Sequence, residues 1–337
     1  MQLIRKKGYA RAGLMGNPSD GYGGKTISLV LHNFFAEVTL YPWDRLEVVT
    51  TELDRSCFDS VTDLLLDVRL HGYYGGVRLI KACIRKFAIY CQRWGFPLEE
   101  TFAVRYASNI PRQVGLAGSS AIIIATLRCL MEFYGIKIAP PVLASLALSV
   151  EVEELGISAG LQDRVAQAYE GLVYMSFAEE AMQQQMDFNC GTYEELDSSL
   201  LPPLYLAYSA NESEPTEVTH NNLRARWELG DVEVRNAMLR FAELAEQAKT
   251  AILSSDRAAL DALIDENFDL RSSICEIAPG QRKMIETARS VGVSSKFAGS
   301  GGAVIGTYPD AATFDALTEA FSKIGCNVIK PQLQAEG

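Results

Sequence analysis

A glycine-rich stretch, residues 111–121 (PRQVGLAGSSA), runs directly into an apolar segment, residues 122–134, that has the pattern of a helix. Gly115 and Gly118 allow backbone conformations with positive φ, and they let a ligand approach the main chain closely. The two serines that follow stand where a helix N-cap is expected, in front of the unpaired N–H groups of the first turn. The stretch predicts an anion site, usually for phosphate, although capping alone is the commoner use of such a turn. No lysine follows the glycines, which disfavours a Walker-type ATPase.

Composition limits the partners of this chain. Its 337 residues are enough for two domains of ordinary size, and the hydrophobic content of 48% provides ample core. A net charge of −11 argues against binding to nucleic acid or to an anionic membrane, because both require clustered lysine and arginine. An anionic small molecule is not excluded, since one basic pocket can lie inside an acidic protein.

The seven cysteines are scattered and form no C-x-x-C pair, so they indicate neither a zinc site nor a disulfide framework. The first residues lack the apolar region of a signal peptide, and no apolar run approaches the length needed to span a membrane. These features predict a cytoplasmic protein with no membrane partner. They leave its oligomeric state open.

Strands and helices are mixed along the chain without regular β-α-β alternation, which predicts an α+β fold. Residues 178–199 are polar and acidic without a clear period, and they are interpreted as a connecting excursion or a domain joint. The expected strands are 26–31, 35–41, 46–51, 102–106, 172–177, 204–208, 294–297, 303–307 and 327–331. The expected helices are 75–94, 120–134, 141–155, 162–169, 221–229, 232–254, 257–273, 280–291 and 312–324.

Two further glycine-rich stretches accompany the first, at residues 10–24 (ARAGLMGNPSDGYGG) and 296–302 (KFAGSGG). In order, spacing and content, the three resemble the motifs of the GHMP kinases, which include galactokinase and mevalonate kinase. The first family motif reads approximately P-G-R-x-x-L-x-G-E-H-x-D-Y-x-G-G, and here Asn17-Pro18 replaces its Glu-His. The second carries one additional residue between Leu116 and Ser119. The segment 151–163 (EVEELGISAGLQD) resembles a fourth element, found in galactokinase.

Within this family the chain resembles the glucuronokinase branch, whose five motifs match residues 16–28, 72–79, 109–121, 154–167 and 295–304. The resemblance implies the two-domain α+β fold of the GHMP kinases. Its N-terminal domain is ribosomal-protein-S5-like and would be residues 1–178, carrying ATP binding and catalysis. Its C-terminal domain is ferredoxin-like and would be residues 200–337.

The resemblance also implies roles for individual residues. Asp163 would accept the proton of the attacking hydroxyl, and Arg11 would stand beside it. A serine hydroxyl, from Ser120 or Ser119, would hold Mg²⁺ together with Glu151, and the additional loop residue leaves the choice of serine open. The phosphates of ATP would be bound by Gly115, Leu116, Ala117, Gly118, Ser119, Ser120, Gly299, Ser300 and Gly301.

On the acceptor side, Asp20 would accept hydrogen bonds from sugar hydroxyls, with Asn17 and Ser19 in the same pocket and Tyr74 offering a flat face to a ring. A carboxylate on the sugar requires a cation or a positive backbone nest. Arg164 is preferred for it, with Arg112, Arg78 and Lys296 as alternatives.

The implied activity is ATP-dependent phosphorylation of the anomeric hydroxyl of D-glucuronate, a step toward UDP-glucuronate. Another acceptor, such as galactose, fucose, galacturonate or mevalonate, is the first alternative. A catalytically silent sensor that binds ATP and sugar is the second. Without the family context, a lone aspartate after a glycine turn is more often a helix cap.

Overall fold

The computed structural model describes residues 3–49, 76–210 and 217–334. Its first sheet is built on two long antiparallel strands, β1 (Ile4–Met15) and β2 (Lys25–Pro42). The order of strands in this sheet is β3-β4-β2-β5-β8. Strand β1 pairs with β2 in addition to this order. The other strands are β3 (Glu47–Val48), β4 (Phe102–Ser108), β5 (Leu172–Ser176) and β8 (Thr192–Leu196).

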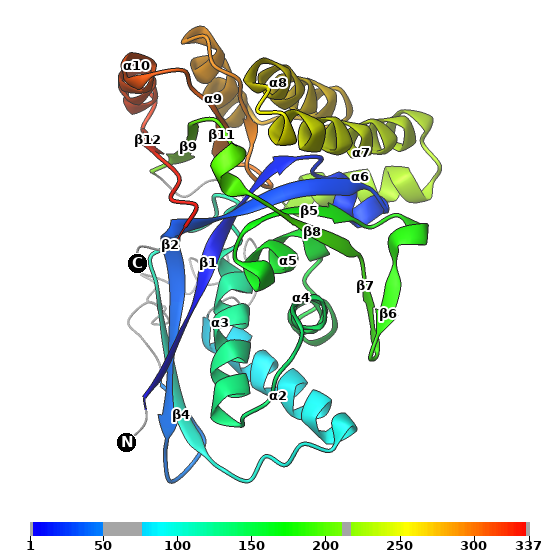
Figure 1. The fold of residues 1–337 in the computed structure, drawn as a ribbon, viewed down its shortest axis with the longest axis vertical. Helices are drawn as coiled ribbons and strands as arrows, with labels where there is room; N and C mark the ends of the chain where they lie inside the picture. Colours follow the sequence, from blue (N-terminus) through cyan, green and yellow to red (C-terminus); the bar gives the residue numbers. More distant parts are fainter. Residues whose placement is uncertain (1–2, 50–75, 211–216, 335–337) are drawn as a thin grey trace, which may run out of the picture.

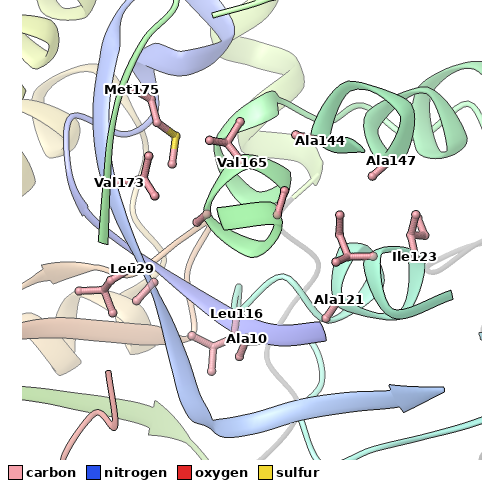
Figure 2. Packing of buried hydrophobic residues seen from close by; sticks show 14 of the residues in the cluster. Ala10, Leu29, Leu116, Ala121, Ile123, Ala144, Ala147, Val165, Val173 and Met175 are labelled. Atoms are coloured by element: carbon pink, nitrogen blue, oxygen red, sulfur yellow. The ribbon is translucent and has the colours of Figure 1, made fainter. Parts of the chain in front are cut away.

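Helices cover one face of this sheet (Figure 1). They are α2 (Gly76–Trp94), α3 (Gly118–Phe133), α4 (Pro140–Ser149) and α5 (Leu161–Tyr169). Helices α3 and α5 pack directly on β1 and β2. Helix α4 packs on α3 and α5. Figure 2 shows the resulting core, in which apolar side chains of the strands meet those of the helices. The burial of nearly every α3 residue from Ser120 to Leu130 explains why this helix is apolar all round.

The second sheet has the order β10-β11-β9-β12, with all of its pairs antiparallel. In chain order its strands are β9 (Leu204–Ser209), β10 (Lys296–Phe297), β11 (Ala303–Thr307) and β12 (Cys326–Ile329). This is the order of a β-α-β-β-α-β ferredoxin-like unit. The helices of this half are α6 (Glu217–Glu228), α7 (Val232–Leu253), α8 (Arg257–Ile274), α9 (Pro279–Ser290) and α10 (Ala311–Ser322). Helix α7 also packs against β2, which brings the two halves together (Figure 1).

The α+β prediction is confirmed, and most predicted helices begin and end within a few residues of their expected bounds. Two predictions are wrong in detail, and one strand was missed. Residues 26–31 and 35–41 were expected as two strands but form the single strand β2, which runs through a register shift opposite Tyr9 and Ala10. The chain stays extended there because the C-terminal segment adds hydrogen bonds. The His32 N–H donates to the Gln332 carbonyl and the Gln332 N–H donates to Asn33 Oδ1, both over 2.8 Å.

Strand β1 was not predicted, because its polar first half hides the alternation. The segment 178–199 is also more ordered than a connection. It forms the hairpin of β6 (Gln183–Gln185) and β7 (Phe188–Cys190), followed by β8, which pairs with β5. As an edge strand, β8 leaves most of its polar side chains exposed, which removes the apolar signal of a buried strand. None of the helices within the described ranges is long and apolar enough to cross a membrane.

Candidate active site

The three glycine-rich stretches meet at the free edge of β1. The backbone N–H of Arg11 donates to the Leu116 carbonyl over 3.1 Å, which ties β1 to the loop before α3. Two residues later, the N–H of Gly13 donates to the Ala298 carbonyl over 2.6 Å, which ties β1 to the loop after β10. Segments separated by more than a hundred residues are thereby placed around one strand.

The two loops also touch each other, and glycine is required where they do. A Cβ atom on Gly299 would overlap the Gly115 carbonyl oxygen. Gly115 has φ +72°, and a Cβ there would lie 2.9 Å from the Gly301 carbonyl oxygen. Both contacts are with backbone that no side-chain rotation can relieve, so the close approach depends on the missing side chains.

The loop before α3 fits a phosphate group. Ala117 adopts the left-handed conformation (φ +60°, ψ +44°) immediately before the helix, and as the N-cap residue it provides no side-chain cap for the first turn. The first N–H groups of a helix have no partner within the helix, and they lie at the positive end of its dipole. Gly115 and Ala117 therefore shape a backbone cradle whose donors suit an anion.

Arg11 and Asp163 form the central ion pair. Arg11 Nη2 lies 2.5 Å from Asp163 Oδ1, and only 7% of the arginine side chain is exposed. The Ala298 carbonyl accepts a second hydrogen bond from Arg11 Nη1 over 2.7 Å, which fixes the guanidinium. Asp163 lies in the first turn of α5, where the helix dipole also favours a negative charge. Its side chain is 22% exposed, so it remains accessible to a reactant.

Asp20 is the second carboxylate of this region. It lies in the short helix Ser19–Tyr22 between β1 and β2, and it accepts a hydrogen bond from the backbone N–H of Gln162. Burial raises the pKa of Asp20 to about 6, and the charge of Asp163 adds to the effect, while Arg11 and Arg164 oppose it. Ser19 is completely buried and its hydroxyl donates to the Lys25 carbonyl over 3.0 Å, so it is committed to the turn.

The raised pKa gives a testable pH dependence. If Asp20 accepts hydrogen bonds from an acceptor sugar, it must be ionised to do so fully. We expect the KM for the sugar to rise as the pH falls through about 6, because Asp20 then takes up a proton. The KM for the nucleotide should not follow this curve. Steady-state kinetics between about pH 5 and pH 8 will test it. An identical sugar-KM profile in Asp20→Asn would contradict this origin.

Glu151 is buried, with 1% of its side chain exposed, in a π-helical turn (Val150–Glu154) that follows α4. π-helical turns often occur at functional sites, because they redirect one side chain. The Ser119 hydroxyl donates to Glu151 Oε1 over 2.7 Å. Arg164 donates to Glu151 Oε2 from Nε over 2.8 Å and also from Nη2. A carboxylate beside a hydroxyl is a donor set that fits Mg²⁺, which takes its further ligands from phosphates and water.

The structure separates residues that the sequence treated alike. Ser119 contacts Glu151, whereas the hydroxyl of Ser120 is buried and donates to the Ala117 carbonyl over 3.1 Å. Arg164, the preferred carboxylate-binding residue, is 5% exposed and is already bound to Glu151 and to the Gly160 carbonyl. Burial alone would lower the pKa of Arg164, but the charges of Glu151 and Asp163 outweigh it and raise the pKa. Tyr74 lies outside the described residues.

Two buried polar residues near the site were not foreseen, and both lie on α8. Asn267 accepts from the Gly16 N–H over 2.8 Å and donates to the Asn17 carbonyl over 3.3 Å. Arg271 donates to the carbonyls of Gly299 and Ser300, over 2.8 Å and 3.0 Å. Burial lowers the pKa of Arg271. They are one helical turn apart on the buried face of α8. Two polar residues in an otherwise apolar stripe were the only sequence sign that this face contacts the site.

Comparison with known proteins defines the class. The family model for the N-terminal domain of the GHMP kinases matches residues 78–171. Lactococcus lactis galactokinase, solved with galactose, shares the fold with a TM-score of 0.76 at 13% identity, covering 98% of this chain and 94% of that one. Together with the full-length relatives described next, this match shows that the chain belongs to the GHMP kinase family.

Relatives within the family are much nearer in sequence. The chain is 43% identical over 324 residues to glucuronokinase 1 of Arabidopsis thaliana, covering 94% of this chain and 88% of that protein. It is 42% identical over 338 residues to probable glucuronokinase 2 of the same plant, covering 98% and 91%. The chain is therefore a small-molecule kinase with glucuronokinases among its relatives.

Proposed function

We propose that the protein transfers the γ-phosphoryl group of ATP to the anomeric hydroxyl of D-glucuronate, giving 1-phospho-D-glucuronate and ADP. The glucuronokinase relatives, which match nearly the whole chain, support the choice of substrate. The observation that carries the chemistry is the Arg11–Asp163 pair, because it places a partly exposed carboxylate beside a buried cation at the edge of the phosphate cradle.

In the proposed reaction the anomeric oxygen attacks the γ-phosphorus as the bond to the β-phosphate oxygen breaks. The hydroxyl proton passes to Asp163, and the leaving electron pair stays on ADP. Arg11 holds Asp163 in place, since its own guanidinium is held by the Ala298 carbonyl. Its positive charge also stabilises negative charge on the transferring group.

The phosphates would lie in the cradle formed by residues 115–120, covered by the loop 299–301. Arg271 holds that second loop in place, because it donates hydrogen bonds to two of its carbonyls. Ser119 and Glu151 would hold Mg²⁺, which when bound neutralises charge on the phosphates. Arg164 then serves to orient Glu151, and it is not free for the substrate.

The choice of Ser119 over Ser120 can be tested by two alanine variants. Ser119→Ala is expected to raise the Mg²⁺ concentration needed for half-maximal activity, since it removes the hydroxyl that touches Glu151. Ser120→Ala should instead lower stability by about 1 kcal/mol, through the lost hydrogen bond to the Ala117 carbonyl. Magnesium titrations of activity and urea unfolding will separate them. A magnesium response that changes only in Ser120→Ala would reverse the assignment.

We also propose a division into two domains, in line with the two sheets. The first would carry nucleotide binding and most of catalysis. It would extend beyond the expected boundary at residue 178 to about Leu196, because β8 pairs with β5 of the first sheet. The second would begin near Leu204, at the first strand of its sheet. A cytoplasmic location is part of the proposal, because the six cysteines in the described ranges are free and mostly buried thiols.

The substrate is best tested with a panel of sugars and sugar acids, measured by ADP release. We expect the highest kcat/KM for D-glucuronate. The panel should include galactose, fucose, galacturonate and mevalonate, since the fold is shared with kinases of neutral substrates. Similar rates for neutral sugars would reject the glucuronate assignment, and nucleotide binding without turnover of any substrate would favour a sensor.

A further inference from the structure

Lys296 is a completely enclosed cation at the site. The residue is 1% exposed, and its ammonium donates three hydrogen bonds. Their acceptors are the Gly13 carbonyl at 2.8 Å, Asn17 Oδ1 at 2.6 Å and the Phe297 carbonyl at 2.8 Å. All three acceptors are neutral, and no ion pair in the described part of the chain includes Lys296. A buried charge without a counter-ion is costly, which points to a role beyond packing.

This cation fixes which way the Asn17 side chain faces. Lys296 Nζ donates to Asn17 Oδ1, so the oxygen of the carboxamide is the atom that meets the lysine. The nitrogen of the same group, Nδ2, is therefore directed away from Lys296. No hydrogen bond among the described residues uses Asn17 Nδ2. The backbone is fixed as well, because the Asn17 carbonyl accepts from Asn267.

Asn17 lies over strand β1, beside Gln162. It packs over Gly13, where an added Cβ would lie 3.2 Å from Asn17 Cγ and 2.7 Å from Gln162 Nε2. Gln162 directly precedes Asp163, and its backbone N–H binds Asp20. Asn17 and Gln162 therefore share Gly13 as a neighbour, and Gln162 links this point of β1 to the proposed base and to Asp20.

The charges here favour an anionic ligand. Lys296 and Arg271 are both buried, and no ion pair among the described residues includes either of them. Burial lowers the pKa of Lys296 well below its usual range, and the charges of Arg271 and Arg11 lower it further. An anion bound next to Asn17 would act in the opposite direction and favour the protonated form of Lys296. Arg164 cannot supply the positive charge for such a ligand, because its guanidinium is already bound to Glu151.

We propose that Lys296 is a positioning residue for substrate specificity, which turns the Asn17 carboxamide so that its N–H₂ group donates to the carboxylate of an acidic sugar. The inference rests on the proposed sugar-kinase function and adds the residues that distinguish a sugar acid from its neutral counterpart.

The test compares D-glucuronate with D-glucuronamide, which differs only in having a neutral amide for the carboxylate. The quantity measured is the ratio of kcat/KM for the acid to kcat/KM for the amide. Asn17→Asp places a carboxylate where the N–H donors were, and we expect it to lower this ratio by at least about tenfold. Lys296→Met removes the amino group and keeps a side chain of similar size. It should also lower this ratio, by reducing kcat/KM for the acid more than kcat/KM for the amide.

Controls separate specificity from folding. Asn189→Asp makes the same chemical change at an exposed position on β7 and should keep the wild-type ratio. Melting temperature and binding of a non-hydrolysable ATP analogue report the integrity of each variant. If Lys296→Met does not fold, Asn17→Asp decides the question alone, because an aspartate beside Lys296 gains an ion pair.

The outcomes distinguish the two proposals. Turnover of glucuronate with an unchanged acid-to-amide ratio in Asn17→Asp would overturn this inference and leave the proposed function standing. Turnover of neutral sugars alone by the wild-type protein would overturn both. A ratio that falls in both variants and stays constant in Asn189→Asp would support the inference.

Discussion

Asp163→Asn is expected to lower kcat by about two to four orders of magnitude while leaving ATP binding nearly unchanged. The substitution keeps the shape of the side chain but removes the group that would accept the hydroxyl proton. Arg11 remains held by the Ala298 carbonyl, so the edge of β1 should keep its geometry. ADP release measures kcat, and calorimetry with a non-hydrolysable ATP analogue measures binding.

Asp187→Asn is a matched control for this variant. Asp187 is also paired with an arginine, Arg93, but this pair is exposed and joins α2 to the turn between β6 and β7. Its removal should change neither kcat nor nucleotide affinity, since exposed ion pairs contribute little. If Asp163→Asn retained turnover within about a factor of ten of wild type, Asp163 would not be the base.

Glu151→Gln should produce the second large effect, on stability as well as on activity. Glu151 and Arg164 are 1% and 5% exposed, and neutralising one leaves the other charge buried with Asp163 as its remaining partner at 3.5 Å. Breaking a buried pair in this way costs about 3 to 5 kcal/mol. Urea unfolding measures the loss. The variant should also require more Mg²⁺ for activity, because it lacks the carboxylate that we propose as a ligand.

Glu153→Gln, two residues further on, is the comparison. Glu153 is 63% exposed and pairs with Lys86 on α2, so its loss should cost less than about 1 kcal/mol and leave the magnesium response unchanged. Equal losses of stability in the two variants would mean that the Glu151–Arg164 pair contributes no more than a surface pair.

The glycine loops and most helices could be predicted from sequence for a local reason. A left-handed backbone at Gly115 and a close approach at Gly299 each require glycine, and an apolar run such as 122–130 has to be buried. Strand β1 could not be predicted in this way. Its polar first half is stabilised by pairing with β2, which is a tertiary effect that no short window of residues contains.

Side-chain partners at the site were the least predictable part. Ser119 and Ser120 are neighbours with the same chemistry, and only the direction of the first turn of α3 decides which one reaches Glu151. Arg164 appeared available for a substrate because its partner, 13 residues earlier, depends on the π-helical turn. The sequence pattern likewise did not show that α8 supports both Asn17 and the last glycine loop.

The hydrogen bonds along the edge of β1 also bear on how the molecule unfolds. Gly13 and Arg11 are bonded to loops that belong to different halves of the chain, and Lys296 reaches from the second sheet to the turn after β1. Neither half can melt without exposing these buried donors, which ties the loss of one sheet to the loss of the other. The strand around which the three glycine-rich stretches meet therefore also couples the two halves, so we expect them to unfold as a single cooperative unit.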